Sequence, residues 1–306
     1  MVVSVPEKTL EHWASIYLTY RYRSKASLWW PARGEDIYVG SLPAVPGKAV
    51  QARAKTTTLN KKGDVHRVKI DLKQLDHYLA LPHGLQPFYV FPMPRWTDTL
   101  EDATAAVGLA VSEVGFSRVD KLSTKPWWFA NWMVALTASQ VGQILATQMA
   151  AFKAGGKVDA DLVTTSFKVG RPQKPVWADG LRHVTIRWRT LWTRLEECGA
   201  ASWPQVVLMP SWVTAGISSV RHEDIRSMLA EAREDPDGEV VVWGSTGDGT
   251  FEPIDAPRDV PDRAGADGLN GNDWRIAVGL SLKALKPGVR RAPISRLPSR
   301  SCPCAT

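Results

Sequence analysis

Apolar and polar positions in the first third of the chain repeat with helical and then with strand periodicity. Residues 5–23 carry apolar side chains at i, i+3, i+4, i+7 and i+8, which predicts an amphipathic helix. Short apolar runs bounded by turn-forming residues follow, and they predict strands. The predicted strands are residues 26–31, 36–42, 48–59, 64–72 and 86–93, with a short helix at 73–81. This order is typical of a compact α/β unit with a mixed sheet.

The strand predicted at residues 48–59, KAVQARAKTTTL, alternates small apolar and long polar side chains. Successive side chains of a strand point to opposite faces, so Gln51, Arg53 and Lys55 share one face and the small residues between them share the other. We expect the small face to pack beneath the N-terminal helix. The polar face is compatible with a functional site or with the wet face of an edge strand, where cations discourage edge pairing.

After Thr97 the pattern favours longer helices. The predicted elements are helices at 98–114, at 126–152, from Arg187 onward and at 222–235, strands at 204–210 and 238–244, and a short strand or helix at 274–285. The glycine-rich GSTGDGT at 244–250 follows a strand without opening a helix, which predicts a hairpin loop and not a phosphate cradle.

The segment at 126–152 contains no charged residue and is long enough to cross a bilayer. Ser139, Gln140, Gln143 and Thr147 nevertheless recur at helical spacing and form one polar stripe. We therefore expect a buried or subunit-interface helix and no membrane span.

Length and composition suggest a large α/β protein with three regions. We expect a core at residues 1–96, a helical and α/β accessory region at 97–254, and a loop with a basic flexible tail at 255–306. The net charge of +7 is compatible with contact to phosphate groups but does not require it. Three cysteines do not make a disulfide framework, and the start of the chain lacks the pattern of a signal peptide, so we expect a reducing, cytoplasmic location.

Acidic and amide residues accompany the cations in the first region. Glu11 shares the helical stripe of apolar residues and should point towards the body of the protein. Asp36 stands where a strand is predicted to begin, and Gln51 and Lys55 follow on the next strand. Phosphodiester hydrolysis commonly uses a divalent metal held by hard oxygen ligands, with a cation near the developing charge. His66, on the strand beside them, is a minor further candidate.

Three pieces of the sequence, in their order along the chain, resemble the PD-(D/E)xK, or restriction-endonuclease-like, nuclease superfamily, and more narrowly its defence-associated members. They are Glu11, the GED that ends at Asp36, and the RAKTTT that contains Lys55. The resemblance covers residues 5–96. It implies a restriction-endonuclease-like mixed sheet flanked by helices, followed by a largely helical and mixed second region. It also implies a Mg²⁺ (or Mn²⁺) cofactor and the catalytic residues Asp36, Lys55, Gln51 and Glu11.

The sequence departs from that pattern where the family has Asp, Glu or sometimes Gln two positions before the lysine, because Arg53 stands there and a guanidinium cannot bind a metal. Gln51 could supply the missing oxygen, so that Glu11, Asp36 and Gln51 hold the metal. Alternatively Glu11 and Asp36 hold it alone and Arg53 binds phosphate. In a third arrangement the site is degenerate and the fold only binds nucleic acid.

The leading hypothesis is a metal-dependent endonuclease-like protein that acts on DNA or RNA in prokaryotic antiviral defence. Arg53, Lys48 and Arg33 are its candidate nucleic-acid contacts, and the region after Thr97 would form a homo-oligomer or bind a partner subunit. The alternative is a catalytically inactive nuclease-fold scaffold that binds nucleic acid or a partner protein. An unrelated α/β fold in a phage or structural protein is a third possibility.

Overall fold

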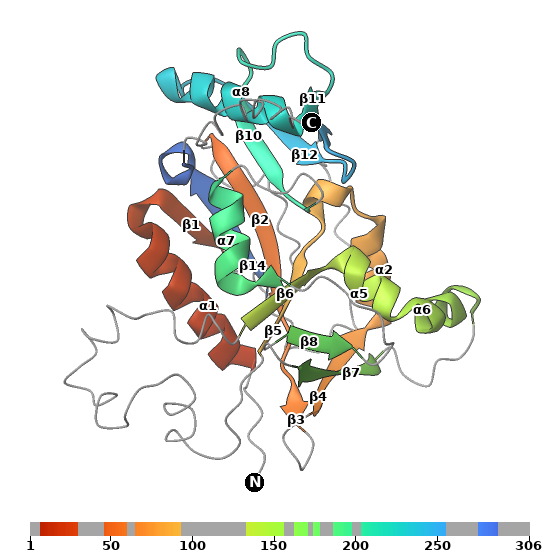
Figure 1. Ribbon diagram of the computed structural model, residues 1–306. Helices are drawn as coiled ribbons and strands as arrows, with labels where there is room; N and C mark the ends of the chain where they lie inside the picture. Colours follow the sequence, from red (N-terminus) through yellow and green to blue (C-terminus); the bar gives the residue numbers. More distant parts are fainter. Residues whose placement is uncertain are drawn as a thin grey trace, which may run out of the picture.

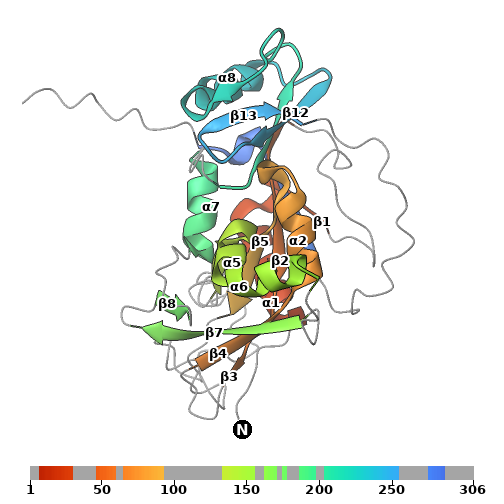
Figure 2. The ribbon, with the colours of Figure 1, turned by 90° about the vertical axis from the view of Figure 1, so that its right-hand side faces the viewer.

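The computed structural model describes residues 7–29, 46–59, 65–92, 133–155, 162–170, 174–177, 186–197, 203–254 and 275–286 (Figure 1). They form an α/β fold with an open, mixed sheet of ten strands flanked by helices. A second sheet of four antiparallel strands, in the order β3-β4-β7-β8, lies at one end of the molecule (Figures 1 and 2).

The first region contains the predicted alternation of helix and strands. Its elements are α1 (Glu7–Tyr22), the 3₁₀ turn η1 (Arg23–Lys25), β1 (Ala26–Trp29), β2 (Gly47–Ala54), β3 (Thr58–Leu59), β4 (Val65–Asp71), α2 (Leu72–Ala80), the 3₁₀ turn η3 (His83–Leu85) and β5 (Phe88–Pro92). The N-terminal helix, the second short helix and the strands predicted at 26–31, 64–72 and 86–93 are thereby confirmed. The strand predicted at 48–59 is confirmed only as far as Ala54, because Thr58 and Leu59 form β3, which belongs to the second sheet. The strand predicted at 36–42 lies outside the described residues.

The remainder of the chain adds strands to both sheets. Its elements are β6 (Met133–Thr137), α5 (Ala138–Ile144), α6 (Ala146–Lys153), β7 (Leu162–Gly170), β8 (Lys174–Trp177), β9 (Ile186–Arg187), α7 (Trp188–Glu196), β10 (Val206–Pro210), β11 (Val220–Arg221), α8 (His222–Glu234), β12 (Val240–Ser245), β13 (Thr250–Pro253), β14 (Arg275–Ser281) and the 3₁₀ turn η7 (Leu282–Ala284). The helix predicted at 98–114 lies outside the described residues. The hairpin predicted at 244–250 is confirmed, because β12 and β13 pair antiparallel on either side of it.

Strand β2 is the centre of the large sheet. Its residues 47–53 pair antiparallel with β14 along one edge. On the other edge its first half pairs antiparallel with β10 and its second half pairs parallel with β5. The path β11-β13-β12-β10-β2-β5-β6-β9 therefore passes through β2, while β14 and β1 extend the sheet from its other edge.

Helices cover both faces of this sheet. On one face, which we call the α1 face, α1 and α7 pack over β2 in a cluster that also contains Val50 and Ala52 (Figure 1). On the other, the α2 face, α2, α5 and α6 gather over β5 and β6 (Figure 2). Alternate residues of β5 divide between the two clusters, with Phe88 on the α1 face and Tyr89 on the α2 face. The sheet is thus a buried layer, as a strand order with helices on both sides requires.

The helix predicted over residues 126–152 is wrong at residues 133–137, where the structure has strand β6 between β5 and β9. Alternate residues of β6 enter the cores on opposite faces, so residues 133–136 are all apolar and the helical and strand patterns cannot be distinguished there. Thr137 then caps α5, accepting a hydrogen bond from Gln140 N at 3.1 Å while Gln140 Oε1 accepts one from Thr137 N at 2.9 Å. No helix among the described residues is long and apolar enough to cross a membrane.

The large sheet draws strands from all three regions expected from the sequence. Strands β2 and β5 precede residue 96, β6 and β10 lie between the two expected boundaries, and β14 follows residue 254. The short element expected at 274–285 is strand β14, and its Val278 is fully buried against the α1-face core. Both expected boundaries therefore fall between strands of one sheet.

Candidate functional site

The apolar face of β2 is packed as its sequence predicts. Val50, Ala52 and Ala54 are buried in the same cluster as Leu10 and Ala14 of α1. Small side chains on this face let the helix approach the sheet closely, which explains why the positions between the long polar residues are alanine and valine. The prediction of a central strand beneath the N-terminal helix is confirmed.

The polar face of β2 is also buried, so it is not the wet face of an edge strand. Gln51 and Lys55 are nearly inaccessible, and Arg53 is fully inaccessible. Tyr78 of α2 lies against Arg53: the guanidinium Nη1 donates a hydrogen bond to the Tyr78 hydroxyl, and its Cζ is 5.6 Å from the ring centroid. Tyr89 is the register partner of Arg53 on β5 and places a second buried aromatic ring on this face.

Keeping cations in this position is costly for folding. Moving a charged group from water into the protein interior costs several kcal/mol unless other groups compensate it, and apolar residues of similar volume often stabilise such a position better. An amide and two cations, Gln51 and Arg53 of the central strand and Lys55 directly after it, are nonetheless buried here. We call these three residues the β2 polar stripe.

Lys48 lies away from the β2 polar stripe. Its position on the strand gives it the orientation of Val50, on the α1 face, and its Nζ donates a hydrogen bond to the carbonyl of Leu195 in α7 at 2.9 Å. The side chain is buried there. The structure therefore does not bring Lys48 together with Arg53 as a shared nucleic-acid contact.

Glu11 is a half-buried residue of α1, on the α1 face of the sheet. Gln51 points to the α2 face, so these two proposed metal ligands begin on opposite sides of β2. Asp36 and Arg33 lie outside the described residues. Within the described ranges, no three His, Cys, Asp or Glu side chains are grouped so that they could hold a metal ion. The oxygen of Gln51 suits Mg²⁺, but the donor set fits this ion only if the Asp36 carboxylate joins it.

His66 of β4 contacts Thr57, which stands three residues after the end of β2. Its Nδ1 is 3.3 Å from the hydroxyl of Thr57, and that hydroxyl donates to the carbonyl of Pro92 at 3.4 Å. Burial lowers the pKa of His66 to about 4, so the imidazole is neutral at physiological pH. It acts in this position as a hydrogen-bonding group and not as a cation.

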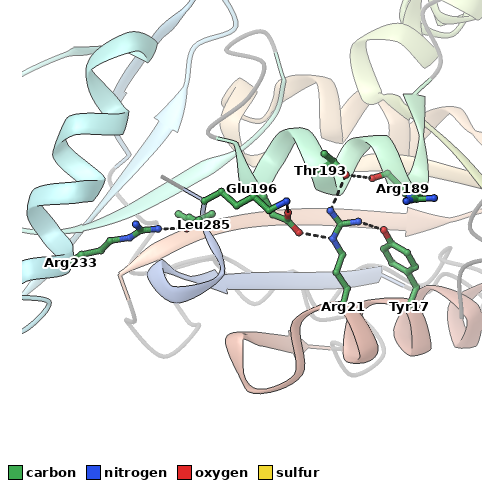
Figure 3. Close-up of polar contacts among 8 residues, drawn as sticks. Tyr17, Arg21, Arg189, Thr193, Glu196, Arg233 and Leu285 are labelled. Atoms are coloured by element: carbon green, nitrogen blue, oxygen red, sulfur yellow. Dashed lines mark hydrogen bonds and ion pairs between the residues drawn. The ribbon is translucent and has the colours of Figure 1, made fainter. Parts of the chain in front are cut away.

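A second charged cluster, which the sequence did not reveal, joins α1 to α7 (Figure 3). Arg21 Nε donates to Glu196 Oε1 at 2.6 Å, and Arg21 Nη2 donates to the Thr193 hydroxyl at 2.9 Å. The Tyr17 hydroxyl accepts a further hydrogen bond from Arg21 Nη1. Lys286, after η7, reaches the other oxygen of Glu196 at 3.2 Å. Arg21 and Glu196 are 175 residues apart in the sequence, so no local pattern could have paired them.

Electrostatics favour the ionised form of Glu196. Burial alone would raise the pKa of this carboxyl, but the hydrogen bond and charge of Arg21, together with Lys286, outweigh burial and hold the pKa below its usual value. Arg233 of α8 contacts the segment at η7, where it donates to the carbonyls of Leu282, at 2.9 Å, and Leu285 (Figure 3). These contacts stabilise the C-terminal strand and turn and include no reactive group.

Ser245 and His83 are neighbours, yet they form a structural contact and not a nucleophile with its base. The Ser245 hydroxyl donates to the carbonyl of Trp203 at 2.8 Å and accepts from the backbone N–H of Gln205 at 3.2 Å. His83 Nδ1 is 3.2 Å from the same oxygen. Because the hydroxyl proton is already donated to a buried carbonyl, the histidine is in no position to remove it.

Comparison with known proteins finds no significant match to any protein family, curated protein or solved structure.

Proposed function

We propose that this protein is a metal-dependent, endonuclease-like protein that acts on DNA or RNA phosphodiesters, with the restriction-endonuclease-like fold that its first region resembles. The supporting observation is the β2 polar stripe, because Gln51 and Arg53 on one face of the central strand, and Lys55 directly after it, are buried where apolar residues would often be more stable. A central strand with a parallel neighbour reached through a helix, as β2, α2 and β5 are arranged, is a rigid support for such a site.

In this proposal the cations of the β2 polar stripe bind the phosphate. Arg53 offers a planar fork of donors that matches phosphate oxygens, and Lys55 supplies a compact positive charge two residues further on. Gln51 and Asp36 would hold Mg²⁺ (or Mn²⁺), which when bound activates water and offsets negative charge. Glu11 is not assigned to this set, because α1 lies on the opposite face of the sheet.

An inactive nuclease-fold scaffold is the second candidate, and one specific observation favours it. The Arg53 guanidinium is fully buried and already donates to the Tyr78 hydroxyl, a contact that a bound phosphate would have to share or displace. A scaffold predicts nucleic-acid or partner binding without turnover.

Cleavage assays separate the two candidates. Labelled DNA and RNA are incubated with wild type, Asp36→Ala, Lys55→Ala and the control Lys153→Ala in the presence of Mg²⁺ or Mn²⁺. Lys153 is exposed in α6 and pairs with Asp76 on the surface, so its variant should cleave as wild type does. We expect wild-type cleavage that both Asp36→Ala and Lys55→Ala abolish. Equal cleavage by all four proteins would refute the catalytic assignment, and binding without cleavage would support the scaffold.

The biological setting that we propose is prokaryotic antiviral defence in the cytoplasm, because the sequence resembles most narrowly the defence-associated members of the superfamily. We also propose that the region after Thr97 forms a homo-oligomer or binds a partner subunit. The turn between β10 and β11 supports such a contact, because it exposes two large apolar side chains, Trp212 and Ile217. The molar mass in solution, compared between wild type and Trp212→Ser, tests the homo-oligomer.

A further inference from the structure

Strand β1 places an exposed tryptophan in line with the β2 polar stripe. Trp29 pairs with Ala277 of β14, and Ala277 pairs in turn with Gln51 of β2. Residues directly opposite one another across neighbouring strands project from the same face of a sheet. Trp29 and Gln51 therefore share the α2 face, two strand spacings or about 10 Å apart.

Small residues separate the tryptophan from the β2 polar stripe. Ala277 is buried between them, and in the next row Gly279 lies between Ser27 and Ala49. A Cβ atom added at Gly279 would meet no heavy atom within 4 Å, so there is open space over this position. Trp29 itself keeps 38 % of its surface exposed. The exposed side chain of Trp29 thus lies beyond a row of small residues on this face.

Exposed cations lie at the end of the same strand pair. Lys25 precedes β1 and Lys283 follows β14, and both are exposed. The Ser281 hydroxyl donates to the Lys25 carbonyl at 3.1 Å, which holds these two chain segments together. Neither lysine takes part in an ion pair within the described part of the chain. Lys25 is four residues from Trp29, and residues 19–29 contain no acidic residue.

We propose that Trp29 stacks on an unpaired base of a single-stranded nucleic acid whose backbone runs past Lys25 and Lys283 towards the β2 polar stripe. This inference rests on the proposed function and specifies its substrate as single-stranded DNA or RNA. An aromatic face accepts any base by stacking, but only where the base is not already stacked inside a duplex. The positive surface and the absence of acidic residues at 19–29 match a phosphate backbone better than an acidic or apolar protein surface.

Binding of labelled oligonucleotides, measured by fluorescence anisotropy in EDTA to prevent cleavage, tests the stacking. We expect wild type to bind single strands more tightly than duplexes of equal length. Trp29→Ala should weaken single-strand binding by roughly ten- to one hundred-fold, and Trp29→Phe should recover most of the loss. The matched control is Tyr20→Ala, since Tyr20 is 43 % exposed in α1, which packs on the opposite face of the sheet; its affinity should remain within about twofold of wild type.

Salt dependence tests the lysines separately. The double variant Lys25→Ala/Lys283→Ala should reduce the slope of log Kd against log salt by about 1.4 on a single strand, whereas Trp29→Ala should leave the slope unchanged. Circular dichroism and melting temperature confirm that each variant is folded.

The outcomes distinguish this inference from the proposed function. If wild type binds or cleaves nucleic acid and Trp29→Ala behaves as Tyr20→Ala does, the stacking role is wrong while the function stands. If Trp29→Ala weakens binding but no protein cleaves, the stacking role stands on an inactive scaffold. If wild type binds neither single strands nor duplexes of DNA or RNA, both proposals are refuted.

Discussion

Replacing Glu196 by glutamine should weaken the junction between α1, α7 and the segment that follows η7. The carboxylate accepts a hydrogen bond from Arg21 at 2.6 Å and pairs with Lys286 at 3.2 Å. Its side chain is 7 % exposed and that of Arg21 is 17 % exposed, whereas Lys286 is 61 % exposed. Glu196→Gln keeps the shape of the side chain but leaves the Arg21 charge without its counter-charge in a nearly buried place.

The expected loss follows from this burial. Removing one partner of a fully buried ion pair costs about 3–5 kcal/mol, whereas an exposed pair contributes about 0–1 kcal/mol. Because Arg21 keeps some contact with water, we expect Glu196→Gln to lower the free energy of unfolding by about 2 kcal/mol. Lys286→Ala should cost under about 0.5 kcal/mol, since its ammonium is largely solvated.

The loss should also depend on pH. The folded-state pKa of Glu196 lies below its usual value, so ionisation contributes stability above the unfolded-state pKa of about 4.3 and that contribution is lost as the pH falls through the folded-state pKa. Urea unfolding followed by tryptophan fluorescence should therefore show a difference between wild type and Glu196→Gln that is complete at pH 7 and shrinks below about pH 4.

Glu231→Gln is the matched control, because Glu231 is an exposed residue of α8 with no ion pair in the described structure. A double-mutant cycle of Arg21→Met with Glu196→Gln should give a coupling of about 1–2 kcal/mol. If Glu196→Gln destabilises no more than Glu231→Gln, or if its effect is the same at pH 3.5 as at pH 7, the stabilising role of the ion pair is refuted.

Three further stability predictions concern single residues. The pKa of His66 is about 4 in the folded protein and near 6.5 in the unfolded chain, so between these values the unfolded state binds one more proton. The free energy of unfolding should therefore fall by up to about 3 kcal/mol between pH 6.5 and 4. In urea titrations, His66→Leu should lack this pH dependence of the free energy of unfolding. Gly84→Ala should cost about 1–3 kcal/mol, because a Cβ there would lie 2.7–2.8 Å from three backbone atoms, whereas Gly279→Ala has open space and should be nearly neutral in thermal melts. Ser245→Ala should cost about 1–3 kcal/mol by leaving the buried Gln205 N–H unsatisfied, and a stability equal to wild type would contradict that account.

Local periodicity was sufficient to predict the elements that build the centre of the fold. The apolar stripe of α1 and the two-residue alternation of β2 predicted that this helix would pack on the small face of this strand, and both side chains and backbone agree. The two-residue alternation of β2 also determines which of its side chains cannot share a face, and this excludes one predicted pair of nucleic-acid contacts. Lys48 and Arg53 differ by five positions, so a strand must point them to opposite faces.

Other features depend on contacts between distant segments and could not be read locally. Strand β6 is buried on both faces, which removes the alternation that would have distinguished it from a helix. The cover over Arg53 comes from Tyr78 on a separate helix, and the alignment of Trp29 with Gln51 requires β14, about 250 residues further along the chain. Asp36, which the proposed site needs, lies outside the described residues.

The most direct test of the proposed nuclease face compares two buried lysines of the same chain segment. Lys55→Met removes a cation from the β2 polar stripe, and Lys48→Met removes one from the opposite face, where it contacts Leu195. Cleavage of a labelled single strand with Mn²⁺ should be lost in Lys55→Met and retained in folded Lys48→Met. Equal cleavage by the two variants would contradict the claim that the polar face of β2 receives the phosphodiester.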